Sequence, residues 1–505
     1  MDDALIARLR ADLTAAHYTV DALETLWGAD AEDALERGDR VPARRALAGR
    51  RGEAAATLAT AFVLGIPVPP DELAAAFPSL GLDGARRLGL VDADGRPGMD
   101  LRPYAFLDAH GAGSWWIASD LGELATGGAL RTDHVLGVGG ASATLAGLQL
   151  PDPVDATLDL GTGCGIQAMH AARRSRRVVA TDISERALDY ARLNAALNGV
   201  TNIEFGLGSL YEPVAGERFD RIVSNPPFVI TPRRPDVPAY EYRDGGLVGD
   251  AIVEAVVAGA REHLVPGGIA QLLGNWEERP GVSGRLSGGL ARATRWADDA
   301  GLESWLVERE TQDPARYAET WIRDGGTRDA DPAYEELVAA WLDDFAGRGV
   351  TGVGFGYVLL RHPVGPLTLR RAERLDAPLG RAAAGLGGHL AAALAAHDVQ
   401  TVLDDDALLA LRLQVAGDVT EERSHWPGSA DPSVIELRQG GGFRRTIRAD
   451  TGLAAVVGAC DGELPTGAIV DAVAQLLEVD AAALRADIAP RVRELLIGGL
   501  LTIAA

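Results

Sequence analysis

Three closely spaced glycines and one carboxylate are the first residues whose types suggest chemistry. Gly161, Gly163 and Gly165 follow an apolar stretch, residues 156–160, and precede a helix-forming segment. Glycine tolerates positive φ and lets a ligand approach the bare backbone. Asp182 ends a second apolar stretch about 20 residues later, where an acid binds ribose hydroxyls in a dinucleotide-type crevice. The spacing predicts a nucleotide-like ligand, and the alternative for the glycines alone is a tight turn without a ligand.

A second group, Asn225-Pro-Pro-Phe228, directly follows another apolar stretch. A planar NH₂ group is a poor nucleophile, because its lone pair is delocalised into a π system. The side-chain carbonyl of Asn225 and the backbone carbonyl of Pro226 can accept its two N–H bonds and orient its nitrogen. Pro226 and Pro227 fix the backbone, and Phe228 offers a flat face for stacking. These residues indicate transfer to a planar nitrogen, and a rigid proline loop is the alternative.

The order and spacing of these motifs resemble those of class I S-adenosylmethionine-dependent methyltransferases, over roughly residues 130–365. The Asn-Pro-Pro-Phe motif resembles the branch that methylates protein glutamine amides, adenine N6 or guanine N2. This resemblance implies S-adenosyl-L-methionine as the cofactor, which carries the reactive methyl group. Transfer would be an in-line displacement that needs no strong base, because the product proton can leave later to water.

The resemblance also implies residue roles. Asp159 would hold the cofactor's amino group, Asp182 its ribose hydroxyls, and Ile183 would pack on its adenine. Many relatives bind the adenine amino group with an Asp after the third strand, where this chain has Ser209. The predicted cofactor-binding residues are Asp159, Gly161, Thr162, Gly163, Gly165, Asp182, Ile183, Ser209, Leu210 and Asn225. The predicted catalytic residues are Asn225, Pro226, Pro227 and Phe228.

Basic and aromatic residues after the motif are candidates for substrate binding. They are Arg233, Arg234, Tyr242 and Arg243. Arginine pairs with carboxylate or phosphate through a planar fork, although a solvated loop is an equally good interpretation. His134 lies in the segment that caps the cofactor in similar enzymes. It could be a general base, but a structural histidine is the favoured interpretation.

Composition and net charge bear on which class of substrate the protein binds. The 505 residues carry a formal net charge of −24 and include no lysine. An acidic surface disfavours non-specific binding to nucleic acid, where phosphate neutralisation dominates affinity, and so favours a protein or peptide substrate slightly. The form Ser-Asn-Pro-Pro-Phe is also that of ribosomal-RNA and transfer-RNA enzymes, so an RNA substrate stays open. The sequence does not give the oligomeric state.

Two cysteines, Cys164 and Cys460, lack CxxC partners. They predict neither a disulfide framework nor a metal site, and Cys164 is expected to be a small buried side chain. No signal peptide is recognisable at the N-terminus, and no apolar stretch reaches the roughly 20 residues that span a bilayer. We therefore expect a cytoplasmic protein without membrane contact.

The elements that must position these residues alternate along the chain. Strands are predicted at residues 157–160, 177–181, 203–206, 221–224, 269–273 and 353–360, with helices such as 167–174, 184–198 and 249–263 between them. The alternation predicts an α/β fold, a doubly wound parallel sheet that binds ligands at the strand carboxyl ends. The resemblance implies a Rossmann-like sheet of seven strands that ends in an antiparallel hairpin.

Four regions are predicted: residues 1–104, a helical or winged-helix-like domain; 105–155, a connector and cofactor-capping segment; 156–365, the methyltransferase domain; and 366–505, a second winged-helix-like domain. In the first, helices at 44–64, 70–77 and 80–88 precede a hairpin at 90–101. In the last, strands at 411–415, 434–438 and 443–447 precede helices at 451–460, 466–477 and 481–497.

Residues 276–350 exceed what a strand-helix-strand unit needs and hold five tryptophans: Trp276, Trp296, Trp305, Trp321 and Trp341. We interpret this segment as an insertion or substrate lid, with ordinary core tryptophans as an equal alternative.

Two other functions stay open. One is a methyltransferase that acts on a carboxylate or hydroxyl of a peptide or small molecule. The other is a winged-helix regulator or binding protein with a degenerate core, which the intact Gly161, Gly163, Asp182 and Asn225 disfavour.

Overall fold

The computed structural model describes residues 2–50, 52–127, 130–280, 288–380 and 385–504, and the chain divides into two compact units. The first unit comprises Met1–Leu107, Gly111–Ala146 and Pro153–Arg374. The second comprises Asp108–His110, Gly147–Asp152 and Leu375–Ala505. Within the described ranges, no helix is long and apolar enough to cross a membrane.

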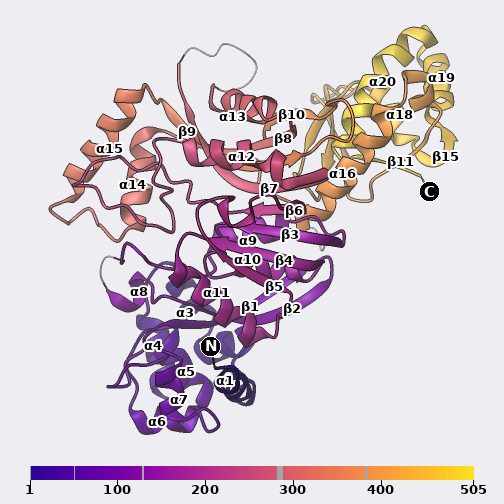
Figure 1. Ribbon diagram of the computed structural model, residues 1–505. Helices are drawn as coiled ribbons and strands as arrows, with labels where there is room; N and C mark the ends of the chain where they lie inside the picture. Colours follow the sequence, from indigo (N-terminus) through magenta and orange to yellow (C-terminus); the bar gives the residue numbers. More distant parts are fainter. Residues whose placement is uncertain (1, 51, 128–129, 281–287, 381–384, 505) are drawn as a thin grey trace. The chain divides into compact units, whose positions relative to one another are not determined.

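An eight-stranded sheet in the order β10-β8-β9-β7-β6-β3-β4-β5 forms the core of the first unit (Figure 1). Its strands are β3 (Val154–Leu160), β4 (Ser175–Asp182), β5 (Ile203–Leu207), β6 (Phe219–Ser224), β7 (Leu264–Glu278), β8 (Glu303–Gln312), β9 (Gly352–Arg361) and β10 (Arg370–Arg374). Only β9 runs antiparallel to its neighbours among these strands. The predicted doubly wound, Rossmann-like fold is confirmed. The sheet has eight strands rather than seven, because β10 pairs with the outer strand β8.

The carboxyl-terminal halves of β3, β4 and β6 are mostly buried because both faces of the sheet are covered. On β4, Val178 and Ala180 pack with α10 (Ile166–Ala172) on one face. The alternate residue, Val179, belongs to the opposite core, with residues of α12 (Ala251–His263) and α13 (Gly288–Asp299). Successive side chains of a strand point to opposite faces, so residues 178–180 contribute to the hydrophobic cores on both faces of the sheet.

The N-terminal region of this unit is helical, as predicted. It contains α1 (Asp3–Ala15), α2 (Val20–Trp27), α3 (Ala29–Glu36), α4 (Val41–Ala48), α5 (Ala54–Phe62), α6 (Pro70–Ala76) and α7 (Gly81–Arg87). The single helix predicted at 44–64 is wrong: it is split into α4 and α5. The hairpin predicted at 90–101 is reduced to one bridge between Val91 and Pro97, because proline has no N–H to extend a ladder. Its winged-helix character stays a prediction.

A two-stranded sheet of β1 (Asp100–Asp108) and β2 (Gly111–Ser119) precedes the eight-stranded sheet along the chain. The following α8 (Glu123–Thr126) and α9 (Gly140–Leu148) precede β3. Two asparagines of α11 (Glu185–Asn198) fix β2 by amide-to-backbone pairs, Asn194 at Ala118 and Asn198 at Trp116. Hydrogen bonds to α11 therefore fix β2, the strand that precedes the cavity-lining part of the capping segment.

The segment 276–350 combines ordinary sheet elements with an addition. β8 and α13 lie within it and belong to the central fold, and α14 (Pro314–Asp324) and α15 (Tyr334–Arg348) are inserted between β8 and β9. Four of its tryptophans are buried core side chains, Trp276, Trp296, Trp305 and Trp341. Trp321 is half-buried on α14.

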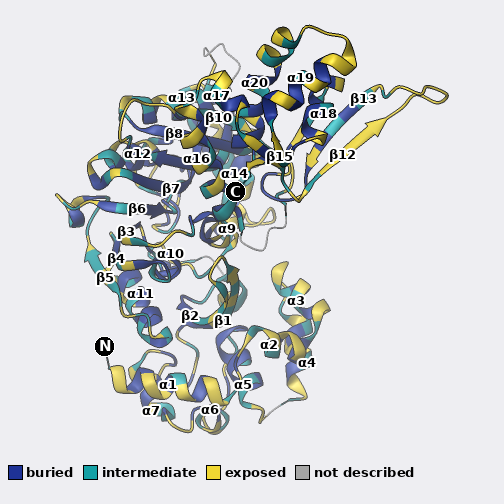
Figure 2. Ribbon diagram, turned by 90° about the vertical axis from the view of Figure 1, so that its right-hand side faces the viewer, coloured by how far each residue is buried: buried dark blue, intermediate teal, exposed yellow. Residues whose placement is uncertain are grey.

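The second unit contains α16 (Gly385–Thr401), α17 (Asp405–Leu409), a sheet of β15 (Asp461–Pro465), β11 (Arg412–Val415) and β16 (Leu501–Ile503), and a sheet of β12 (Val419–Ser424), β13 (Val434–Gln439) and β14 (Thr446–Ala449). Its remaining helices are α18 (Thr451–Gly458), α19 (Thr466–Leu477) and α20 (Ala481–Ile497). These three helices lie where they were predicted. Their inner faces form the unit's core, whereas β12 is largely exposed (Figure 2). The winged-helix assignment stays a prediction.

Candidate active site

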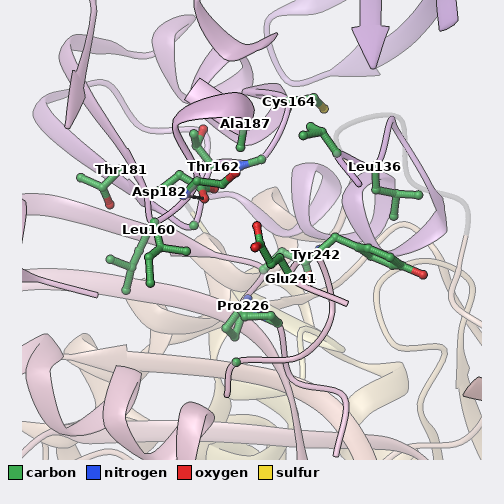
Figure 3. A pocket seen from close by; sticks show the side chains of 18 of the residues that line it. Leu136, Leu160, Thr162, Cys164, Thr181, Asp182, Ala187, Pro226, Glu241 and Tyr242 are labelled. Carbon is green, nitrogen blue, oxygen red and sulfur yellow. Dashed lines mark hydrogen bonds between the residues drawn. The ribbon is translucent and has the colours of Figure 1, made fainter. Parts of the chain in front are cut away.

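The carboxyl ends of β3, β4 and β6 border a cavity of about 400 Å³. Figure 3 shows Thr162 and Asp182 on one side of it and Pro226 on the other, with Glu241 between them. We call residues 161–163 and 182–184 the glycine wall, and residues 225–230 and 241–246 the motif wall. Eleven of the predicted site residues line the cavity: Gly161, Thr162, Gly163, Asp182, Ile183, Ser209, Leu210, Asn225, Pro226, Pro227 and Tyr242.

The three glycines have two different roles. Gly161 (φ +76°) and Gly163 (φ +55°) line the cavity, and a Cβ added to either would meet no atom within 4 Å. A Cβ on Gly165 (φ +88°) would come within 3.0 Å of Ala191 on α11. Positive φ is needed at all three positions. The first two glycines leave room for a ligand, and the third allows close packing between helix and turn.

Asp182 lies on the glycine wall and is held by the backbone around it. Its Oδ2 accepts a hydrogen bond from the N–H of Gly163 at 2.9 Å, and its Oδ1 accepts one from Ser184 at 2.9 Å. Burial raises the pKa of this carboxyl above its usual value. Each oxygen keeps a further lone pair, so the group can still accept bonds from a diol.

Asp159 is buried behind the glycine turn and does not line the cavity. Its Oδ2 accepts bonds from Thr162 Oγ1 at 2.5 Å and from the N–H of Ala168 at 2.8 Å. Its Oδ1 is buried without a hydrogen-bond partner among the described residues. Burial raises the pKa of this carboxyl to about 7. Asp159 therefore braces the turn, and its contact with a cofactor amino group stays a prediction.

On the motif wall, Asn225 Oδ1 is a buried acceptor with no partner among the described protein groups. The carbonyl of Pro226 accepts a bond from the N–H of Phe228 at 2.7 Å, which leaves one lone pair for another donor. Phe228 does not line the cavity. Its half-buried ring packs between the sheet core and the α14–α15 core, so a stacking role against substrate stays a prediction.

The three predicted substrate arginines do not line the cavity and are paired within the protein. Arg233 bonds to Asp244, Arg234 to Asp236, and Arg243 to Asp324 at 2.6 Å. Arg243 is also buried. Of the four predicted substrate-binding residues, only Tyr242 is among the described residues that line the cavity.

The capping segment forms another part of the lining, with His134, Val135, Leu136 and Gly137. The buried Asp120 fixes it: this carboxylate accepts bonds from the N–H of Val135 at 2.8 Å, from Tyr190 Oη at 2.9 Å and from Arg186. Burial lowers the pKa of His134, which favours a neutral imidazole. Sequence reasoning found the segment but missed Asp120, because a lone Asp after a strand carries no distinguishing pattern.

Glu241 was also missed, although it is exposed and lines the cavity. No pattern in the sequence separates it from other surface glutamates. Cys164 is buried as predicted, and burial raises the pKa of its thiol to about 11. The thiol is therefore protonated at neutral pH.

The strand order, the antiparallel β9 and a cavity at the strand carboxyl ends agree with the Rossmann-like fold expected from the resemblance to class I methyltransferases. Residues 140–279 match the family described as "Methyltransferase small domain", which confirms the resemblance drawn from the motifs. Residues 15–103 match a second family, described as "Domain of unknown function (DUF7059)".

Curated relatives are similar over part of this chain. A release factor glutamine methyltransferase of Xylella fastidiosa is 40% identical over 134 residues, 25% of this chain and 48% of that protein. That of Deinococcus radiodurans is 42% identical over 123 residues, 22% and 42% of the two chains. A ribosomal protein uL3 glutamine methyltransferase of Bradyrhizobium diazoefficiens is 33% identical over 151 residues, 28% and 46%. The chain thus spans about half the length of these relatives.

Proposed function

We propose that this chain transfers the methyl group of S-adenosylmethionine to the side-chain amide nitrogen of a glutamine in a protein substrate. The main observation in support is that Asn225 Oδ1 is a buried acceptor without a partner among the described protein groups. Asn225 lines the cavity beside Pro226. A buried polar atom is costly unless a hydrogen bond satisfies it. An NH₂ group of the substrate is a donor that fits this atom, and the glutamine methyltransferase activities by which the relatives are named agree with such a substrate.

The glycine wall fits the cofactor. S-adenosylmethionine, when bound, supplies a methyl group on a positively charged sulfonium. Gly161 and Gly163 leave open space where side chains would otherwise stand. Asp182 keeps acceptor capacity for two ribose hydroxyls, and the exposed side chain of Ile183 offers an apolar face to a planar base. Ser209 lies in the same lining, and its hydroxyl can take the place of the Asp found in many relatives.

The motif wall orients the amide nitrogen of the substrate glutamine. Asn225 Oδ1 and the free lone pair of the Pro226 carbonyl accept the two N–H bonds, which turns the nitrogen lone pair towards the glycine wall. Holding reactants in one geometry removes much of the entropic barrier to their reaction. The buried surroundings of Asn225 strengthen both hydrogen bonds, since water does not compete with them. The proton leaves the product nitrogen to water after transfer.

The charge of the lining supports a protein rather than a nucleic acid. Asp182 and Glu241 line the cavity, and its described lining residues include no arginine. The chain contains no lysine and has a net charge of −24. Nucleic-acid binding depends mainly on cationic contacts to phosphate, and this lining supplies none.

The test is label transfer by the full chain from S-adenosylmethionine tritiated in the methyl group to a cell extract. Parallel samples are treated with nuclease or protease after the reaction. We expect protease to release the label from the macromolecular fraction and nuclease to leave it there. Loss of label with nuclease would identify a nucleic acid and contradict the proposed substrate, and no label in any fraction would contradict the activity.

A further inference from the structure

The motif wall is bonded to the C-terminal end of α14: the bonded residues Tyr242 and Asp324 are 82 positions apart in the chain. The carboxylate of Asp324 accepts a hydrogen bond from Tyr242 Oη at 2.8 Å and another from Arg243 Nη1 at 2.6 Å. Tyr242 lines the cavity. One carboxylate on α14 therefore fixes a residue of the site and the residue that follows it.

Arg243 makes this attachment rigid. Its Nη1 also donates to the carbonyl of Trp321 at 2.6 Å, and its guanidinium lies 4.6 Å from the ring centroid of Tyr240. The side chain is only 6% exposed. A buried charge left without its partner is strongly destabilising, so Arg243 has few other positions open to it. The arginine predicted to bind substrate is instead an internal anchor.

Main-chain bonds carry this anchor to the motif. The carbonyl of Arg243 accepts a bond from the N–H of Val229 at 2.7 Å, and the N–H of Gly245 donates to the carbonyl of Pro227 at 3.0 Å. Both bonds join the two strips of the motif wall. A displacement of Arg243 therefore displaces the backbone next to Asn225.

A second attachment comes from the first half of α14. Tyr317 Oη accepts bonds from the N–H of Ile230 at 2.9 Å and from Asn275 Nδ2 at 2.8 Å. Tyr317 is fully buried, and Val229 and Ile230 belong to the same hydrophobic core as α14 and α15. The segment that follows the motif is thus held by a backbone hydrogen bond at Ile230 and by the packing of the Val229 and Ile230 side chains.

We propose that α14 positions the motif wall for methyl transfer, with Asp324 as the positioning residue for Tyr242 and, through Arg243, for Pro227. This inference rests on the proposed function. The helix lies outside residues 140–279, the part of the chain that matches the methyltransferase small domain. The inserted helices α14 and α15 accordingly determine the geometry of the substrate side, while the cofactor side is built without them.

The test compares the full-length variants Asp324→Ala and Tyr317→Phe, with Glu319→Gln as the matched control. The side chain of Glu319 on α14 is 43% exposed, and its described ion pair is to Arg323 at 3.5 Å. Amide hydrogen exchange should be about ten-fold faster at Val229 and Gly245 in Asp324→Ala, as for one lost bond to a charged group. Ile230 should respond in the same way in Tyr317→Phe, and Glu319→Gln should match the wild type.

Kinetics add a second readout. We expect the initial rate of methyl transfer to the protein fraction of the cell extract to fall about 10- to 100-fold in Asp324→Ala, the cost of misplacing a reacting group. The affinity for S-adenosylhomocysteine should stay within about threefold, because Asp182 is held by the backbone of Gly163 and Ser184 and not through Asp324. Asp324→Asn keeps one acceptor oxygen and should recover part of the loss.

Exchange at Val229, Gly245 and Ile230 that is unchanged in both variants would overturn the proposal, whatever the turnover. Equal losses of cofactor affinity and turnover would overturn it too, since they indicate general destabilisation. A wild-type chain that transfers no methyl group, yet shows the expected exchange changes, would contradict the proposed function and leave the positioning role intact.

Discussion

The two walls of the cavity are held in place by different means. On the glycine wall, Asp182 bonds to Gly163, 19 positions away, and Asp159 braces the turn through Ala168, 9 positions away. On the motif wall, Tyr242 bonds to Asp324 across 82 positions and Ile230 to Tyr317 across 87. The glycine wall is a local unit of strand, turn and strand. The motif wall depends on an inserted pair of helices, so the substrate side can change without disturbing the cofactor side.

Removing the amide of the motif wall should have the largest effect. Asn225→Ala is expected to lower turnover about 100- to 1000-fold, as for loss of one preorganised hydrogen-bonding group in an active site. Calorimetry with S-adenosylhomocysteine should give an affinity within about threefold of the wild type, because the glycine wall is intact. Turnover close to that of the wild type would show that Asn225 does not orient the nitrogen.

The converse change breaks the glycine wall. Asp182→Ala should weaken binding of S-adenosylhomocysteine about 10- to 100-fold, since hydrogen bonds to a charged acceptor contribute about 1.5–3 kcal/mol. Asp189→Asn is the matched control, because Asp189 is an exposed carboxylate of α11 paired with Arg192. If Asp182→Ala bound as tightly as this control, the ribose contact would be wrong.

The smallest effect concerns stability and pH. The Asp159 carboxyl has a pKa of about 7 in the folded chain against 3.8 as its ordinary value. The unfolded chain therefore loses this proton first as pH rises, so folding is disfavoured progressively between about pH 4 and pH 7. Asp159→Asn cannot ionise and keeps an acceptor for Thr162 and Ala168. The melting temperature of Asp159→Asn relative to the wild type should rise by about 4–8 °C over that window and then level off.

Thermal unfolding of both chains from pH 4 to pH 8 checks this expectation. A difference in melting temperature that is constant across the range would show that Asp159 is not a titrating buried group.

The sequence predicted the glycine wall well because its determinants are local. An apolar stretch, a glycine turn and an acid after the next strand specify Gly161, Gly163 and Asp182 without knowledge of the rest of the fold. The Asn225–Pro227 strip was predicted for the same reason. The α/β alternation gave most of the sheet, but β8 was hidden in the tryptophan-rich segment, where its buried Trp305 was weighed as part of a lid.

Residues held by distant partners could not be predicted. Arg243 is a residue type typical of substrate anchors, and only the fold brings Asp324 to it. Asp120 acquires its role because α11 brings Arg186 and Tyr190 to it. An ion pair between segments far apart in sequence leaves no pattern in either segment, and this limits sequence reasoning for the motif wall and the capping segment.

The central claim is methylation of an amide nitrogen, and the chemistry of the product tests it most directly. Protein labelled with the tritiated methyl group is isolated and divided, one part for strong acid hydrolysis and one for mild alkali. An N-methyl amide should release its label as methylamine in acid and keep it in mild alkali. Release as methanol in mild alkali would identify a carboxylate ester and contradict the role given to Asn225 and Pro226.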